Sequence, residues 1–129
     1  MPKRTLAAED ATRSERSYLV EVCKACVEAG AVTIELPDTL GYSTPDEYGL
    51  LVSTVVKALP DNIVVSTHCH DDFGLAVANT LAGIKNGAKQ VEVTVNGIGE
   101  RVGNAAAEEV IMALKIREDE FKKDISYIN

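Results

Sequence analysis

The chain has 129 residues, of which 46% are hydrophobic, and this is enough apolar sequence to build the core of one globular domain. Its formal net charge of −7 argues against general binding to nucleic acids or anionic membranes, because phosphate-rich surfaces are bound by clustered lysine and arginine. Its apolar runs fall well below the ~18 residues of a membrane-spanning helix. The start Met1-Pro2-Lys3-Arg4 lacks an apolar signal region, so we expect a cytoplasmic protein.

Helices and strands are predicted to alternate along the chain. Apolar periodicity, glycines and prolines predict a helix at about 14–29, a strand at 33–36, a helix at 45–59, a strand at 63–67, a helix at 74–86, a strand at 90–95 and a helix at about 104–117. The second helix has the clearest start, because Thr44, Pro45 and Glu47 match a capping box. Alternation with crossovers of this length indicates parallel strands, in either a (β/α) barrel or a doubly wound sheet.

The three cysteines do not suggest the disulfide framework of a small secreted protein. Cys23 and Cys26 have the spacing of a redox pair, but they fall late in the first predicted helix and on its apolar stripe. A redox pair gains its low thiol pKa at a helix N-terminus instead. We therefore expect reduced cysteines that pack in the core.

Two histidines follow the predicted strand 63–67. His68 and His70 are two residues apart, so in extended backbone their side chains point to the same side, and both imidazoles can reach one metal ion at about 2.0 to 2.1 Å. Cys69 points to the opposite side and is not expected to be a ligand. A lone His-x-His pair also arises by chance, so this spacing alone does not establish a metal site.

A glycine-rich segment, residues 96–104, follows the predicted strand 90–95. Its glycines allow close backbone approach to a ligand, while Glu100, Arg101 and Asn104 bring a carboxylate, a guanidinium and an amide oxygen. The alternative is a simple turn in which Asn104 caps the next helix. Since polar residues follow several successive strands, they are expected to meet at one carboxyl-end face, and this favours a barrel.

Four motifs resemble the 2-isopropylmalate synthase family, metal-dependent TIM-barrel enzymes that condense acyl-CoA with 2-oxo acids. They are residues 9–14 (EDATRS), 36–42 (LPDTLGY), 68–74 (HCHDDFG) and 96–104 (NGIGERVGN). Related lyases carry a cysteine-bearing glycine loop in place of residues 97–101, so the resemblance favours condensation over cleavage. It covers nearly the whole chain.

The resemblance implies roles for six residues. His68, His70 and Asn104 match ligands of a divalent metal ion, with Mg, Mn, Zn and Co all compatible with such donors. Thr39 matches a residue that holds the 2-oxo acid, and Glu9 and Glu100 match acidic residues of the active site. The implied reaction joins acetyl-CoA to 2-oxoisovalerate. Pyruvate and 2-oxoglutarate, the substrates of citramalate and homocitrate synthases, remain alternatives.

The resemblance also implies that residues 1–129 form only part of a barrel, about units five to eight of its eight βα units. Family members have an amino-terminal half-barrel and a carboxyl-terminal regulatory region that this chain lacks, so we expect it to be inactive alone. A complementary half-barrel or a second copy is the expected partner. We expect an open sheet of this kind to expose branched side chains such as Ile34, Val65 and Val93. Exposed apolar surface of this extent favours a homo-oligomer.

Overall fold

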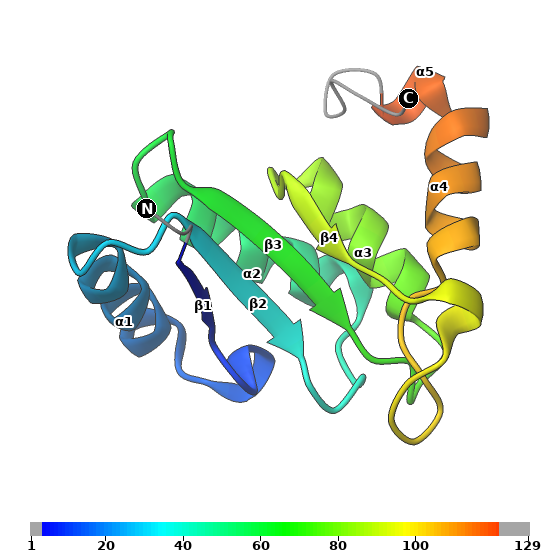
Figure 1. The fold of residues 1–129 in the computed structure, drawn as a ribbon, viewed down its shortest axis with the longest axis horizontal. Coiled ribbons are helices and arrows are strands. Elements are labelled where there is room, and N and C mark those ends of the chain that lie inside the picture. Colours follow the sequence, from blue (N-terminus) through cyan, green and yellow to red (C-terminus); the bar gives the residue numbers. More distant parts are fainter. Residues whose placement is uncertain (1–3, 122–129) are drawn as a thin grey trace.

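The structure is a computed structural model that describes residues 4–121. Its sheet has four parallel strands in the order β1-β2-β3-β4, so neighbours in sequence are neighbours in space (Figure 1). The strands are β1 (Thr5–Ala7), β2 (Thr33–Asp38), β3 (Val64–Cys69) and β4 (Gln90–Glu92). The helices are α1 (Arg16–Glu28), α2 (Pro45–Ala58), α3 (Ala76–Lys85), α4 (Ala107–Ile116) and α5 (Glu118–Phe121), with 3-10 turns η1 (Ala11–Arg13) and η2 (Val95–Gly97). The predicted α/β class with parallel strands is confirmed.

The core lies between the sheet and the helices behind it. Figure 1 shows α2 and α3 against one face of the sheet. Ile34 and Leu36 on β2 and Val65 on β3 are buried there, with exposures of 2% or less. The hydroxyl of Tyr48 on α2 donates a 2.6 Å hydrogen bond to the carbonyl of Leu36, which satisfies a buried polar group in this apolar layer.

The opposite face of the sheet carries mainly polar side chains, and the prediction that Ile34 and Val65 are exposed is wrong. Because side chains alternate along a strand, burying Ile34 and Val65 under the helices turns their neighbours to the other side. Val93 follows β4 and also packs against the core. We give the name open face to five of the polar side chains on that side: Glu35, Ser66, His68, Gln90 and Glu92.

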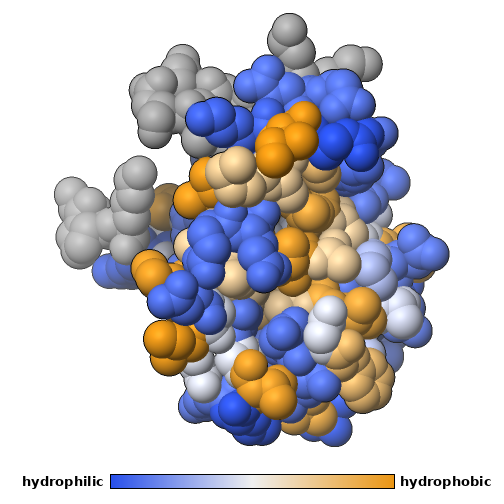
Figure 2. Space-filling view, turned by 90° about the vertical axis from the view of Figure 1, so that its right-hand side faces the viewer, coloured by the Kyte–Doolittle hydropathy of each residue, from blue (hydrophilic) through white to orange (hydrophobic). Residues whose placement is uncertain are grey.

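Exposed apolar side chains lie instead on α4 and on the loops, with Tyr18 on α1 and Leu50 on α2. The view onto the α4 side shows apolar surface between polar side chains (Figure 2). Ile111, Met112 and Ile116 of α4 are exposed, the last at 69%. Within residues 4–121, no helix is long and apolar enough to cross a membrane.

Several element boundaries differ from prediction. β1 was not predicted, and β3 continues to Cys69, because backbone hydrogen bonds to β2 extend over the whole stretch. β4 ends at Glu92, and the turn η2 begins three residues later, at Val95. The capping box of α2 is confirmed on one side by the carboxylate of Glu47, which accepts a 3.0 Å hydrogen bond from the backbone N–H of Thr44.

The predicted core position of the Cys-x-x-Cys pair is confirmed for its first member. Cys23 is fully buried on α1, and burial raises the pKa of its thiol to about 11. Cys26 is half-buried and packs against the edge of the core. A thiol with a raised pKa is a poor nucleophile, so Cys23 is unsuited to be the attacking thiol of a redox pair.

Candidate active site

His68 and His70 lie side by side at the carboxyl end of β3. Their rings are stacked, with centroids 5.2 Å apart and planes inclined by 8°. His68 is the fifth residue of β3, and His70 follows the strand directly. The prediction that the two imidazoles share one side is therefore confirmed.

Asn104 lies opposite His70. The two residues form an isolated antiparallel bridge, flanked by hydrogen bonds from the N–H of Asp71 to the carbonyl of Gly103 and from the N–H of Ala105 to the carbonyl of Cys69, both 3.0 Å. The glycine-rich segment thus returns to the end of β3. Asn104 does not cap a helix, because α4 begins three residues later and its N-cap position is Ala106.

One buried polar atom of His70 and one of Asn104 lack a hydrogen-bond partner among the described residues. They are Nδ1 of His70 and Oδ1 of Asn104. Burial lowers the pKa of His70, with the charges of His68 and Arg101 acting in the same direction, so its imidazole stays neutral. A neutral imidazole nitrogen and an amide oxygen are both good ligands for a divalent ion, so these residues fit a metal site.

The set of metal ligands that residues 4–121 provide is partial. Within residues 4–121, no group of three or more histidine, cysteine, aspartate or glutamate side chains is placed to hold a metal ion. Two imidazoles and one amide are what the described residues offer. Divalent ions commonly have four to six ligands, so water, substrate or other protein groups must supply the remainder.

Thr39 lies in the loop after β2 and is fixed from two directions. Its Oγ1 accepts a 2.9 Å hydrogen bond from the backbone N–H of Asp10, and its carbonyl accepts a 2.8 Å bond from Nη2 of Arg101. Arg101 also forms a two-pronged ion pair with Asp72, with both N–O distances 2.8 Å. These contacts connect the loops that follow all four strands, at the carboxyl end of the sheet.

Glu9 and Glu100 are exposed at the same end of the sheet. Glu9 follows β1, whereas the side chain of Glu100 is 80% exposed and lies 3.6 Å from Nη1 of Arg101. Among the described residues, no hydrogen bond or ion pair joins either carboxylate to His68 or His70. The structure therefore brings Glu9 and Glu100 to the rim of the site, and their catalytic roles stay predictions.

Asp38, at the end of β2, was expected among the polar residues of the carboxyl-end face, and the structure shows that it organises this end of the sheet. Its fully buried carboxylate accepts hydrogen bonds from the hydroxyls of Thr12 (3.0 Å) and Ser43 (3.2 Å) and from the amide of Asn79 (3.4 Å). Its carbonyl accepts a 3.3 Å bond from the N–H of His70. An aspartate at the end of an apolar strand was the available signal, but its partners come from distant segments.

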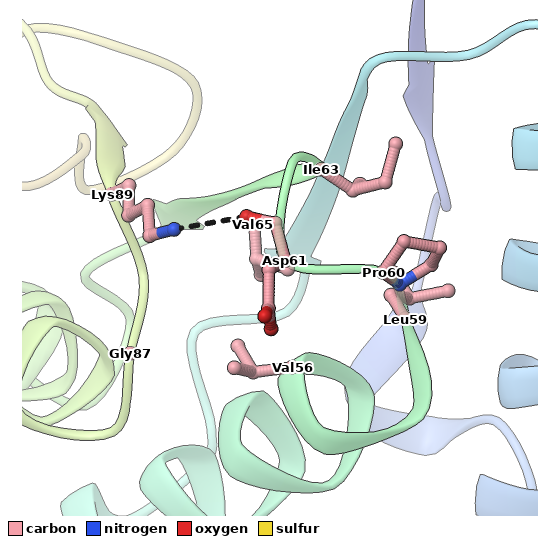
Figure 3. Close-up of a pocket in the computed structure, with 8 residues that line it drawn as sticks. All are labelled: Val56, Leu59, Pro60, Asp61, Ile63, Val65, Gly87 and Lys89. Atoms are coloured by element: carbon pink, nitrogen blue, oxygen red, sulfur yellow. Dashed lines mark hydrogen bonds between the residues drawn. The ribbon is translucent and has the colours of Figure 1, made fainter.

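Two of the hollows in the described surface differ in their position relative to the carboxyl end of the sheet. One, of about 190 Å³, has Asn104 in its wall together with Asp71, Asn96 and Glu109. The other, of about 40 Å³, lies at the opposite end of the sheet, where Lys89 reaches the carbonyl of Asp61 at 3.2 Å (Figure 3). Only the first is placed to extend a site around Asn104.

Comparison with known proteins shows the family to which the chain belongs. A family model described as HMGL-like matches residues 3–128. The chain belongs to the HMGL-like family. A protein named 2-isopropylmalate synthase from Salinibacter ruber (strain M8) is 61% identical over 117 residues, which are 89% of this HMGL-like chain and 21% of that protein. One from Bradyrhizobium diazoefficiens is 53% identical over 117 residues, covering 89% and 22% of the two chains.

A solved structure supports the same fold. An HMG-CoA lyase from Acinetobacter baumannii, in complex with coenzyme A and 3-methylmalate, has a TM-score of 0.70 and 26% identity, over 87% of this chain and 40% of that one. The four parallel βα units of the HMGL-like chain are a segment of the TIM barrel of this family, and the barrel alternative is confirmed. The chain spans about a fifth of the length of the curated relatives it matches.

Proposed function

We propose that this chain is a part of the catalytic barrel of a 2-isopropylmalate synthase, which joins acetyl-CoA to 2-oxoisovalerate and releases CoA. The observation that carries the proposal is a pair of buried polar atoms, Nδ1 of His70 and Oδ1 of Asn104, beside the stacked ring of His68; neither atom has a hydrogen-bond partner among the described residues. Relatives named 2-isopropylmalate synthase, up to 61% identical, supply the substrate class.

His68, His70 and Asn104 would hold a divalent metal ion, and the chemistry that such an ion would supply here is polarisation of the ketone of a 2-oxo acid. The burial of His70 keeps its imidazole neutral, and Asp38 holds the backbone that presents it. Because the described residues provide only part of a ligand set, we assign the remaining ligands to the substrate and to other parts of the enzyme.

Thr39 is proposed to bind the carboxylate of the 2-oxo acid. Its oxygen already accepts a hydrogen bond from Asp10, so its hydroxyl proton is free to be donated. Glu9 and Glu100 are proposed as the catalytic carboxylates. Both are exposed at the rim, where a general base must meet the acetyl methyl of acetyl-CoA.

Metal titration of the 129-residue chain tests this function. Zinc or manganese should bind weakly to the wild type, and the double variant His68→Ala/His70→Ala should lose that binding. Addition of 2-oxoisovalerate should tighten metal binding more than pyruvate or 2-oxoglutarate does, since the preferred acid supplies ligands in the best geometry. Equal metal affinity in the wild type and the double variant would contradict the assignment.

Turnover is expected to need more than this chain. The metal, the 2-oxo acid, a base and CoA must be held within about half an ångström of productive geometry. A CoA-release assay should therefore give no rate above that of a His70→Ala control. Robust turnover by the isolated chain would contradict this part of the proposal.

We also propose that the chain assembles with a complementary half-barrel or with a second copy of itself. In the described residues, β1 and β4 are edge strands, each paired on one side only, and an unpaired parallel edge favours association. Sedimentation equilibrium over a wide concentration range measures this. A stable monomer at tens of micromolar would exclude the homo-oligomer.

A further inference from the structure

A short contact on the open face joins Glu35 of β2 to His68 of β3. Oε1 of Glu35 lies 2.5 Å from Nδ1 of His68. In the strand register His68 is opposite Pro37, so Glu35 reaches diagonally across to the imidazole. The side chains of Glu35 and His68 are 14% and 31% exposed, so the contact is partly shielded from water.

We propose that Glu35 is a positioning residue that holds the proton of His68 on Nδ1 and so directs the lone pair of Nε2 toward the metal site. A carboxylate can only accept, so the nitrogen that faces it must carry the proton. The other ring nitrogen is then unprotonated and available as a ligand. The inference rests on the proposed function, because it concerns the metal site assigned there.

The ring of His68 is also fixed in direction. It is held by Glu35 at Nδ1 and by stacking on His70, so it cannot rotate without losing one of the two contacts. His70 differs, because its Nδ1 has no hydrogen-bond partner among the described residues. His68 is therefore the imidazole whose tautomer is set before any metal binds.

A second carboxylate on the open face provides a matched control. Glu92 is the register partner of His68 on β4, so its charge is also close to that ring. Its Oε1 is instead engaged by the hydroxyl of Ser66 at 3.2 Å and the amide of Gln90 at 2.7 Å. Glu92→Gln thus removes a nearby negative charge while leaving the contact between Glu35 and His68 in place.

Nitrogen-15 NMR of the imidazole rings tests the tautomer without any metal. At about pH 8, above the ordinary histidine pKa of about 6.5, His68 should be protonated on Nδ1 in the wild type and in Glu92→Gln. Glu35→Ala should populate both tautomers of His68, with Glu35→Gln between the two, while His70 is unchanged. A proton on Nε2 in the wild type, or an unchanged tautomer in Glu35→Ala, would overturn the proposal.

Zinc titration of the same variants tests the consequence. Loss of a group that orients a ligand typically weakens metal binding by about 10 to 100-fold, and this is the change expected for Glu35→Ala. Glu92→Gln should stay within about threefold of the wild type, and circular dichroism should show all variants folded. Equal weakening in both variants would mean that charge alone acts, and this would overturn the positioning role.

The two proposals fail in distinguishable ways. A wild-type chain that shows the Nδ1 proton on His68 but binds no zinc contradicts the proposed function. A chain that binds zinc through His68 and His70 with unchanged affinity in Glu35→Ala contradicts the role of Glu35 alone.

Discussion

The backbone of His70 lies directly opposite that of Asn104, in an isolated antiparallel bridge within an otherwise parallel arrangement. The bridge brings Asn104 of the glycine-rich segment to the end of β3, although 33 residues lie between His70 and Asn104 in the chain. Backbone hydrogen bonds on both sides fix this approach, so the relative position of the two side chains does not depend on a bound ion.

Gly99→Ala is predicted to weaken metal binding while leaving the fold intact. A Cβ atom at Gly99 would lie 2.7 Å from Nδ2 and 2.9 Å from Cγ of Asn104, so the amide would have to move. We expect about a tenfold loss of zinc affinity, in the range seen when support of a ligand is lost. Val102→Ala, at an exposed position of the same loop, is the control. Unchanged affinity in Gly99→Ala would argue against Asn104 as a ligand.

Asp38→Ala is predicted to destabilise the chain by about 2 to 4 kcal/mol, because each buried donor left without an acceptor costs about 1–3 kcal/mol. The hydroxyls of Thr12 and Ser43 and the amide of Asn79 would lose their shared partner. Urea unfolding measures the change. Thr12→Ala, which removes only one of these donors, should cost less than half as much. Similar losses for the two variants would show that Asp38 is not the centre of this network.

The capping carboxylate of Glu47 is predicted to contribute to the acid sensitivity of the chain. Hydrogen bonds from the backbone and hydroxyl of Thr44 hold the pKa of Glu47 below its usual value of 4.5. Since the folded-state pKa is the lower one, the stabilisation is present above pH 4.5 and is lost as the pH falls through the folded-state pKa. Thermal unfolding should be measured between about pH 7 and about pH 3, a range that spans the titration of carboxylates. The melting temperature of Glu47→Gln should fall less over this range than that of the wild type.

Asp46→Asn is the matched control for that experiment, because Asp46 lies in the same turn of α2 and accepts no hydrogen bond from Thr44. Its pH profile should follow that of the wild type. If Glu47→Gln and Asp46→Asn changed the profile equally, the general charge of the helix start would explain the effect instead of the cap.

Thiol labelling is predicted to distinguish the three cysteines. Burial raises the pKa of Cys23 to about 11 and that of Cys69 to about 12, so neither forms appreciable thiolate near neutral pH. Cys26 is only half-buried. In native protein a disulfide reagent should modify Cys26 first, and Cys26→Ser should remove the fast phase. Rapid labelling of Cys23 would contradict its place in the core.

Local sequence signals predicted much of the fold. The capping pattern at Thr44 to Glu47 and the glycine stops fixed the alternation of helices and strands, and the two-residue period placed His68 beside His70. The side of the sheet on which Ile34 and Val65 lie was predicted wrongly, because a short apolar strand does not show which face its helices cover. Pairs such as Glu35 with His68 depend on strand register, which one sequence cannot supply.

The hydrophilic character of the open face determines what can cover it. The carboxylates of Glu35 and Glu92 are only partly buried, so covering them is unfavourable unless new hydrogen-bond donors replace the solvent. A surface that covers this face must therefore present hydrogen-bond donors at matching positions, and apolar side chains there would bind unfavourably. Association through this face therefore favours a polar partner surface over an apolar one.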